Sequence, residues 1–222
     1  MEKKEVDIII LTYNRKELLV QVLEKLKTQT IQDFNLILTD DGSKELINPN
    51  EYPFIKKYIW DFDEGYNRVN KFNECIDMCV SDKIIILDDD CVPLHDTFLE
   101  THVSNLNLFD ISKGIIRFKD PFASSKGLTL DPQKWFSTVN IGFKKNIISE
   151  LKGFDPEFNG HYGFEDVDLG LRVDKGGFTI SSFIESSSVL HLGVMYKDGD
   201  RSDEVIGHNK NYFIKKWGFP PK

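Results

Sequence analysis

Three adjacent carboxylates follow a stretch that is typical of a buried strand. Residues 83–93 read Lys-Ile-Ile-Ile-Leu-Asp-Asp-Asp-Cys-Val-Pro, so an apolar run leads directly into Asp88, Asp89 and Asp90. A short run rich in β-branched residues predicts a strand that is buried on both faces. Neighbouring carboxylates repel one another and favour a counter-charge, which a divalent cation held by hard oxygen ligands would supply. The alternative is a solvated acidic turn after the strand.

A second group of carboxylates lies in the stretch 153–172, where Glu165, Asp166 and Asp168 stand at the start of a helical pattern of apolar residues. Carboxylates at a helix N-terminus are stabilised by the helix dipole, which is one account of their position. The other account is that one of them faces a cleft and acts as a general base. The residues alone leave both accounts open.

The elements that would position the first group form a βαβ unit. Residues 6–11 predict a strand, and residues 35–39 predict a second one. Between them a helix is expected from about Arg15 to Lys27, with Asn14 as its N-cap and Glu17 completing a capping box. This order predicts a parallel sheet, whose ligands bind at the carboxyl ends of the strands.

Polar residues follow each of these strands at that same edge of the sheet. Thr12 follows the first strand, Asp40 and Asp41 follow the second, and the run 88–90 follows the acidic strand. Three polar clusters at one edge indicate a ligand site more specifically than any one of them does.

The rest of the chain adds shorter elements and one ambiguous histidine. His191 lies within Val-Leu-His-Leu, and a single histidine in an apolar strand is on its own expected to be a core residue. Residues 209–222 predict an amphipathic helix that caps the core, with contact to an acidic membrane surface as the alternative. Further strands are expected at 57–60, 113–118, 139–143, 178–183 and 187–192, helices at 69–80, 95–108 and 144–151, and a mobile loop at 120–132.

Composition describes an ordinary globular protein of 222 residues, which suits one α/β domain. The formal net charge of −8 argues against nucleic-acid partners, which require a basic face. The sequence has no apolar run long enough to span a membrane and no signal-peptide pattern at its start, so a cytoplasmic location is expected. The 3 cysteines are then expected to be reduced thiols, with Cys75 and Cys79 filling the core.

Taken together, these motifs resemble those of the family 2 glycosyltransferases, which have the GT-A fold. The resemblance rests on Leu-Thr-Tyr-Asn-Arg at 11–15, Thr-Asp-Asp-Gly-Ser at 39–43, and Glu-Gly-Tyr at 64–66 with Asn73 near the position of a family Arg-Asn pair. Residues 88–93 correspond to the Asp-x-Asp motif. The stretch 153–172 is similar to the carboxyl-terminal region of galactosyl- and N-acetylgalactosaminyltransferases and of chondroitin-polymerase-type bacterial enzymes.

The resemblance runs from Val6 to about Leu192 and implies a Rossmann-like GT-A domain with a mixed, mostly parallel sheet flanked by helices. It implies one domain over 1–222, with a nucleotide-binding half at 1–110 and an acceptor- and sugar-binding half at 111–222. The residues that it assigns to the nucleotide are Thr12, Asn14, Asp40, Asp41, Lys71, Asp88 and Asp89, while Asp90 and His191 are assigned to Mn²⁺ or Mg²⁺.

The resemblance also implies the residues of the transfer step. Asp166 would be the base that deprotonates the acceptor hydroxyl, and Glu165 would hold the acceptor or the donor sugar. The chain departs from the family at Phe72, where an arginine usually precedes the asparagine. Either Arg68 or Lys71 takes over the contact of that arginine with the base or phosphate, or the contact is lost.

The implied activity is the inverting, metal-dependent transfer of a hexose from a UDP-sugar, with galactose or N-acetylgalactosamine as the expected sugars. The acceptor would be a glycan or a lipid-linked molecule in polysaccharide biosynthesis. The protein is expected in the cytoplasm, either free or in peripheral contact with the inner membrane face. A sugar-nucleotidyl transferase is a competing interpretation, but it requires a Gly-rich basic phosphate loop that the sequence lacks. A non-catalytic module that binds nucleotide sugars is another.

Overall fold

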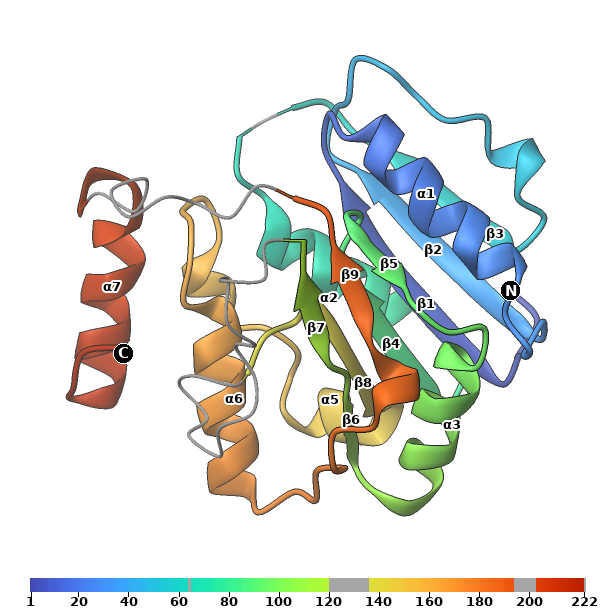
Figure 1. The fold of residues 1–222 in the computed structure, drawn as a ribbon. Coiled ribbons are helices and arrows are strands. Elements are labelled where there is room, and N and C mark those ends of the chain that lie inside the picture. The colour runs from blue at the N-terminus through green and yellow to red at the C-terminus, as the bar shows by residue number, and fades with distance from the viewer. Residues whose placement is uncertain (64, 120–135, 194–202, 222) are drawn as a thin grey trace.

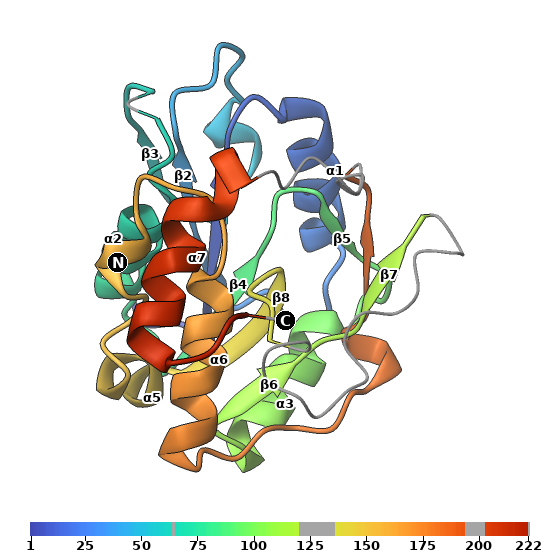
Figure 2. The same cartoon turned by 90° about the vertical axis from the view of Figure 1, so that its left-hand side faces the viewer.

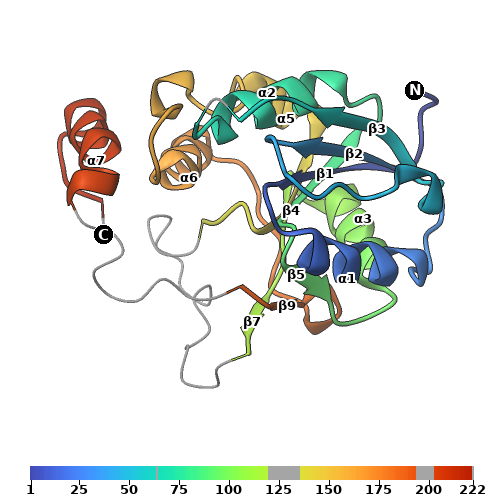
Figure 3. The ribbon, with the colours of Figure 1, turned by 90° about the horizontal axis from the view of Figure 1, so that it is seen from above.

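The computed structural model of the protein describes residues 1–63, 65–119, 136–193 and 203–221. Within these residues a six-stranded sheet in the order β3-β2-β1-β4-β8-β6 is flanked by helices on both faces (Figures 1 and 3). Strands β3, β2, β1 and β4 are parallel, and β8 runs antiparallel to both β4 and β6, which confirms the predicted mixed, mostly parallel sheet. These strands are β1 (Val6–Thr12), β2 (Phe34–Asp40), β3 (Ile55–Trp60), β4 (Lys83–Leu87), β6 (Ile111–Lys113) and β8 (Asn140–Lys144).

A smaller sheet in the order β5-β9-β7 continues the chain beyond the acidic run, because β5 begins directly after Asp90. Its strands are β5 (Cys91–Pro93), β7 (Ile116–Phe118) and β9 (Val189–His191). The α-helices are α1 (Lys16–Lys27), α2 (Arg68–Met78), α3 (Phe98–Leu108), α5 (Lys145–Glu150), α6 (Glu165–Gly176) and α7 (Asp203–Trp217), and short 3₁₀ turns are η1 (Pro49–Glu51), η2 (Pro156–Phe158) and η3 (Glu185–Ser187).

The two faces of the large sheet are covered by different helices because side chains alternate along each strand. Ile9 and Ile37 face a hydrophobic cluster that includes residues of α2, α5, α6 and α7. Their neighbours Ile8 and Ile10 face a second cluster with residues of α1 and α3. The central strands are therefore buried on both sides, and their polar residues are confined to the strand ends and the turns that follow.

Three predictions about local structure were wrong. The capping box fails because helix α1 has Arg15 at its N-cap position without a side-chain hydrogen bond. Asn14 adopts a left-handed conformation (φ 51°), and its Oδ1 atom accepts the Lys44 backbone N–H at 2.9 Å, so it ties two strand ends together instead. The single strand expected at 113–118 is divided between two sheets at Gly114, where a side chain would overlap Asn140.

The third error is the strand expected at 178–183, where the structure has only one bridge, between Ile180 and Ile111. The loop expected at 120–132 and Glu64 of the Glu-Gly-Tyr motif lie outside the described residues. The helix expected at 209–222 spans Asp203–Trp217 instead, and the other expected helices and strands occur within a few residues of their predicted positions.

A buried histidine connects α3 to the large sheet. His102 is fully buried, its Nε2 atom donates to Asn140 Oδ1 at 2.9 Å, and its Nδ1 atom accepts from the Ser112 hydroxyl at 2.8 Å. Because the Asn140 oxygen can only accept, this pattern requires the neutral Nε2–H tautomer. Burial lowers the pKa of His102 to about 4.

The burial of His102 should make the stability of the protein depend on pH. An unfolded histidine titrates near pH ~6.5, so between that pH and about 4 the unfolded chain binds a proton that the native chain excludes. The free energy of unfolding should therefore fall by about 3 kcal/mol as the pH drops through this window. Urea unfolding at pH 7 and pH 4.5 measures this change in wild type and in His102→Gln. His95→Gln, which replaces a half-buried histidine, is the control. An unchanged pH slope in His102→Gln would contradict the assignment.

Helix α7 packs beside α6 (Figures 1 and 2), which confirms that the tail caps the core. Phe213 is fully buried in the cluster that contains Leu169 of α6. Asn209 is also fully buried, and its Nδ2 atom donates to the carbonyl oxygens of Phe158, His161 and Gly163. In the part of the chain that the structure describes, every helix is too short or too polar to span a membrane.

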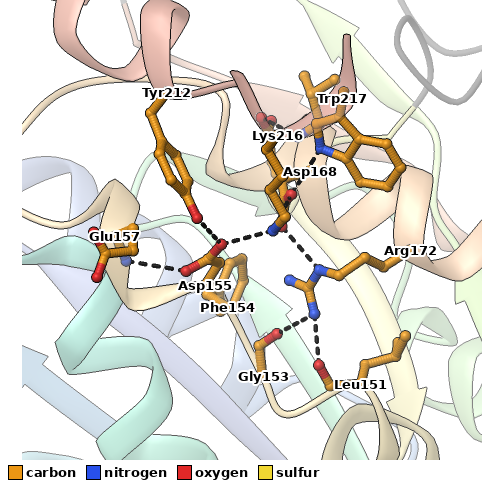
Figure 4. A network of polar contacts seen from close by, with 12 residues as sticks. Leu151, Gly153, Phe154, Asp155, Glu157, Asp168, Arg172, Tyr212, Lys216 and Trp217 are labelled. Atoms are coloured by element: carbon orange, nitrogen blue, oxygen red, sulfur yellow. Dashed lines mark hydrogen bonds and ion pairs between the residues drawn. The ribbon is translucent and has the colours of Figure 1, made fainter. Parts of the chain in front are cut away.

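A network of charged groups joins α7 to α6 (Figure 4). Asp168 is fully buried and accepts hydrogen bonds from Arg172 Nε at 2.8 Å and Trp217 Nε1 at 2.9 Å. Lys216 Nζ lies 2.6 Å from carboxylate oxygens of both Asp168 and Asp155. Asp168 therefore has a structural role in joining α6 to α7. Glu165 and Asp166, the other two carboxylates at the start of α6, are not part of this network.

Removing the charge of Asp168 should destabilise the protein, because Arg172 and Lys216 would lose a buried partner. We expect Asp168→Asn to lower the free energy of unfolding by about 2 kcal/mol, below the cost of breaking a fully buried pair because Lys216 remains partly exposed. Urea unfolding at pH 7 measures the change. Asp174→Asn, at the exposed end of the same helix, is the matched control and should change stability by less than about 0.5 kcal/mol.

Candidate active site

The acidic run is held by an arginine from the first loop. Asp89 and Asp90 are buried, with 3% and 2% of their surface exposed. Thr12 Oγ1 donates to Asp89 Oδ2 at 2.8 Å, and Arg15 Nη1 lies 3.2 Å from Asp89 Oδ1 and 2.9 Å from Asp90 Oδ2. Burial raises the pKa of Asp89 to about 6, although Arg15 and Thr12 oppose the rise. The counter-charge that the sequence required is thus supplied in part by Arg15, which sequence reasoning did not assign to the site.

A mixed cluster of possible metal ligands lies at the start of β5. Asp90 Oδ1 is 3.8 Å from His191 Nε2 and 3.5 Å from Cys91 Sγ, and one ligand atom from each residue lies within 4.8 Å of the others. His191 Nδ1 is buried and has no hydrogen-bond partner among the described residues. Oxygen, nitrogen and sulfur ligands at these distances fit a divalent cation after small side-chain movements.

Gly193 packs closely against this cluster. A Cβ atom at that position would overlap Asp90 Oδ2 and crowd the His191 ring, so a glycine is needed for the carboxylate and the imidazole to take these positions. The placement of His191 also corrects the expectation from its residue pattern alone. It is a half-buried side chain beside a carboxylate and not a satisfied core residue.

Arg68 connects the two acidic groups that the sequence placed far apart. At the first position of α2, its Nη2 atom donates to Asp88 Oδ1 at 2.8 Å and its Nε atom lies 3.6 Å from Glu165 Oε1. Burial alone would lower the pKa of Arg68, but Asp88, Tyr66 and Glu165 outweigh burial and the pKa is raised. Asp88 and Glu165, one carboxylate from each acidic group, therefore converge on one cation.

Glu165 and Asp166 form the first turn of α6, immediately after Phe164 in a left-handed conformation (φ 72°). Burial raises the pKa of both carboxyl groups, and the charge of Asp166 raises that of Glu165 further. Glu165 Oε2 is buried without a hydrogen-bond partner among the residues that the structure describes. Two adjacent acids with raised pKa values are typical of proton-transfer sites.

Lys113 is a buried charge on the other side of Asp166. It is 1% exposed, and its Nζ atom donates to the Ser137 carbonyl oxygen at 3.0 Å. Burial lowers the pKa of Lys113 to about 7, and the charge of Asp166 opposes this shift. Sequence reasoning missed this residue, because a lysine at the end of a predicted strand gives no sign of being buried.

The remaining predicted nucleotide residues gather at the ends of β1 to β3. Asp40 accepts hydrogen bonds from the Ser43 backbone N–H at 2.8 Å and the Tyr58 hydroxyl at 3.0 Å. Asn14 binds the following turn, as described above. Burial raises the pKa of Asp41, and the charge of Lys71 opposes this rise.

Lys71 forms ion pairs with Asp61 and, at 4.0 Å, with Glu74, and among the described contacts none joins Lys71 to the acidic run. In the structure, Thr12 is therefore in contact with the acidic run through Asp89. Asn14, Asp40, Asp41 and Lys71 form a neighbouring group along the same edge of the large sheet.

Comparison with known proteins adds a family match. The sequence model described as "Glycosyl transferase family 2" matches residues 7–118. The chain is 29% identical to a chondroitin synthase of Pasteurella multocida, over 75% of this chain and 22% of that protein. It is 26% identical to a chondroitin synthase of Escherichia coli, over 91% of this chain and 36% of that protein. The chain therefore spans only about a quarter to a third of the length of these curated relatives.

Two solved structures share the fold. The Staphylococcus aureus TarS fragment 1–349 in complex with UDP-GlcNAc superposes with a TM-score of 0.72 at 11% identity, covering 96% of this chain and 66% of that one. The Pyrobaculum calidifontis mannosyltransferase PcManGT in complex with GDP-Man and Mn²⁺ gives a TM-score of 0.67 at 15% identity, covering 100% of this chain and 67% of that one. At these identities the likeness concerns the fold.

Proposed function

Since the chain belongs to glycosyl transferase family 2, we propose that it transfers a hexose from a UDP-sugar to a glycan or lipid-linked acceptor with inversion at the anomeric carbon. Galactose, N-acetylgalactosamine or a related hexose is the proposed sugar, and polysaccharide synthesis is the proposed process, in line with the two chondroitin synthases among its relatives. The single observation that carries the proposal is the convergence of Asp88 and Glu165 on Arg68.

We assign the divalent cation, Mn²⁺ or Mg²⁺, to Asp90 and His191. The support is the ligand cluster, in which His191 Nε2 lies 3.8 Å from Asp90 Oδ1, and the close approach of Gly193 to both side chains, together with the Mn²⁺ in the mannosyltransferase of the same fold. When bound, such an ion neutralises the charge that develops on a leaving diphosphate. Asp88 and Asp89 would lie on the nucleotide side, where Arg68 binds Asp88 and Arg15 binds Asp89.

The nucleotide pocket would extend from this cluster along the ends of β1 to β3. Thr12, Asn14, Asp40 and Asp41 lie at the ends of β1 and β2, and Lys71 of α2 pairs with Asp61 directly after β3. The carboxyl ends of the strands are where open α/β sheets bind ligands. We further propose that Arg68 replaces the arginine that the family usually has at position 72. It lies one turn before Phe72 on the same face of α2, with its guanidinium 4.6 Å from the Phe72 ring centre.

Asp166 is the proposed general base, and Glu165 the residue that holds the acceptor or donor sugar. An acceptor hydroxyl must lose its proton as it attacks, and a buried carboxylate with a raised pKa accepts that proton well near neutral pH. One base facing one activated leaving group suits a single displacement with inversion. Retention by a covalent path would need a second carboxylate on the opposite face.

Incubation with a panel of UDP-hexoses and Mn²⁺, with release of UDP as the readout, tests the proposal. Slow release without acceptor that oligosaccharides accelerate is the expected result. Consumption of pyrophosphate or a sugar 1-phosphate would instead identify a sugar-nucleotidyl transferase. Tight binding of UDP-sugars without turnover would identify a binding module. Contact of the tail with a membrane surface stays a prediction, which sedimentation with anionic vesicles measures.

A further inference from the structure

The ligand cluster contains one group that the proposed function leaves unused, the thiol of Cys91. Cys91 pairs directly with His191 across the antiparallel β5–β9 ladder. Directly opposed residues of two strands carry their side chains on the same face of a sheet, so Sγ and the imidazole project to the same side. The Asp90 carboxylate, which immediately precedes β5, lies 3.5 Å from Sγ.

We propose that Cys91 Sγ is a direct ligand of the divalent cation, so that the site binds its ion through oxygen, nitrogen and sulfur. Besides the Mn²⁺ or Mg²⁺ of the proposed function, such a site binds thiophilic cations such as Co²⁺, Zn²⁺ and Cd²⁺ with high affinity. This inference rests on the metal site of the proposed function and specifies its ligands. Thiolate sulfur favours softer ions, whereas a site built only of carboxylate and water favours Mg²⁺ and Mn²⁺.

The distances allow three-point binding. Two ligands bound at about 2.0–2.3 Å to one tetrahedral or octahedral ion lie roughly 3–4 Å apart. The carboxylate–thiol and carboxylate–imidazole separations of 3.5 and 3.8 Å already fall within this range, and the cluster as a whole fits within 4.8 Å. Coordination therefore needs only small rotations of side chains, with the thiol proton released to bulk solvent.

The other two cysteines of the sequence lie in hydrophobic surroundings. Cys75 and Cys79 are buried on α2 and at its end, inside the hydrophobic cluster that faces α6. Cys91 also contacts a hydrophobic cluster, on the opposite face of the sheet, but it additionally has a carboxylate and an imidazole within ligand distance. The chain thus provides matched control thiols.

Titration of the full chain with Co²⁺ in the presence of UDP tests the inference without measuring activity. Wild type should develop the near-ultraviolet charge-transfer band of a cobalt–thiolate bond, and Cys91→Ser should lack it. The double variant Cys75→Ala/Cys79→Ala leaves Cys91 as the sole cysteine of the sequence and should keep the band. Competition titrations should show that Cys91→Ser loses on the order of tenfold in Cd²⁺ affinity and less than about twofold in Mg²⁺ affinity.

The outcomes separate this inference from the proposed function. Visible cobalt bands without a thiolate band would leave the ion on Asp90 and His191 and overturn the role of Cys91. A thiolate band that persists in Cys91→Ser would assign the sulfur to another cysteine and also overturn it. Absence of Co²⁺ binding while Mg²⁺ or Mn²⁺ still binds would overturn the role of Cys91 alone, and absence of binding of all these ions would also overturn the metal assignment of the proposed function. Melting temperatures with and without ion identify variants that fail to fold. If Cys91→Ser does not fold, the presence or absence of the thiolate band in Cys75→Ala/Cys79→Ala decides the test, because this double variant retains Cys91.

Discussion

Asp90→Ala is expected to abolish turnover and to remove the metal-dependent part of UDP binding. Asp90 is the carboxylate shared by the cluster, with one oxygen near Arg15 and the other facing His191 and Cys91. Without it a cation would keep too few ligands to neutralise the leaving diphosphate. We expect UDP release to fall by at least about 10³-fold, which corresponds to about 4 kcal/mol of lost transition-state stabilisation.

Calorimetric titration of UDP with and without Mn²⁺ provides the second readout for Asp90→Ala. Wild type should bind UDP more tightly when Mn²⁺ is present, and the variant should bind equally in both conditions. Asp77→Ala, at an exposed position of α2, is the control for losing one negative charge and should behave as wild type. Turnover at the wild-type rate in Asp90→Ala would show that the metal assignment is wrong.

The strands and their polar ends could be predicted because their pattern is local. The apolar run before Asp88 and the βαβ order of residues 6–39 fix both the parallel sheet and the edge where the carboxylates gather. Alternation along a strand and periodicity along a helix depend on neighbouring residues only. The sequence alone therefore predicts that Thr12, Asp40 and the acidic run lie at one edge of the sheet.

The carboxylate partners of the cations in the site could not be predicted in the same way, although the resemblance named Arg68 as a candidate for a contact with the base or phosphate. Arg15 and Arg68 each stand at the start of a helix, where an arginine is ordinarily a solvated residue, and their carboxylate partners are distant in sequence. Lys113 became part of the site because the chain divides at Gly114 between two sheets, which strand periodicity does not reveal. Long-range pairing of charges depends on how the elements pack, and a single sequence carries little record of it.

His191 shows how a resemblance can add to a residue pattern. Its apolar neighbours indicated a core position, and only the motif order associated it with a metal. The structure places it beside Asp90 because β9 pairs with β5, an adjacency of strands that are far apart in the chain. The motif therefore supplied information about topology that hydrophobic periodicity lacks.

Asp166→Asn should separate donor binding from transfer. Asn has nearly the same shape but cannot accept a proton, so the dissociation constant of a UDP-hexose should stay within about twofold while acceptor-dependent UDP release falls by about 10²- to 10⁴-fold. Asp174→Asn, at the exposed end of the same helix, is the control. Calorimetry with donor and a rate assay with oligosaccharide acceptors measure the two effects, and transfer that persists would place the base elsewhere.

The pH dependence of wild type gives the same base a second test. Burial raises the pKa of Asp166, so the group is protonated at a higher pH than an exposed aspartate would be. Acceptor-dependent turnover should therefore be lost as the pH falls through this raised pKa, while donor binding weakens less. Lys113 opposes the shift, so Lys113→Met should move the acid limb of the rate profile to higher pH. If Lys113→Met left that limb unchanged, the charge that tunes the base would have to come from Arg68 alone.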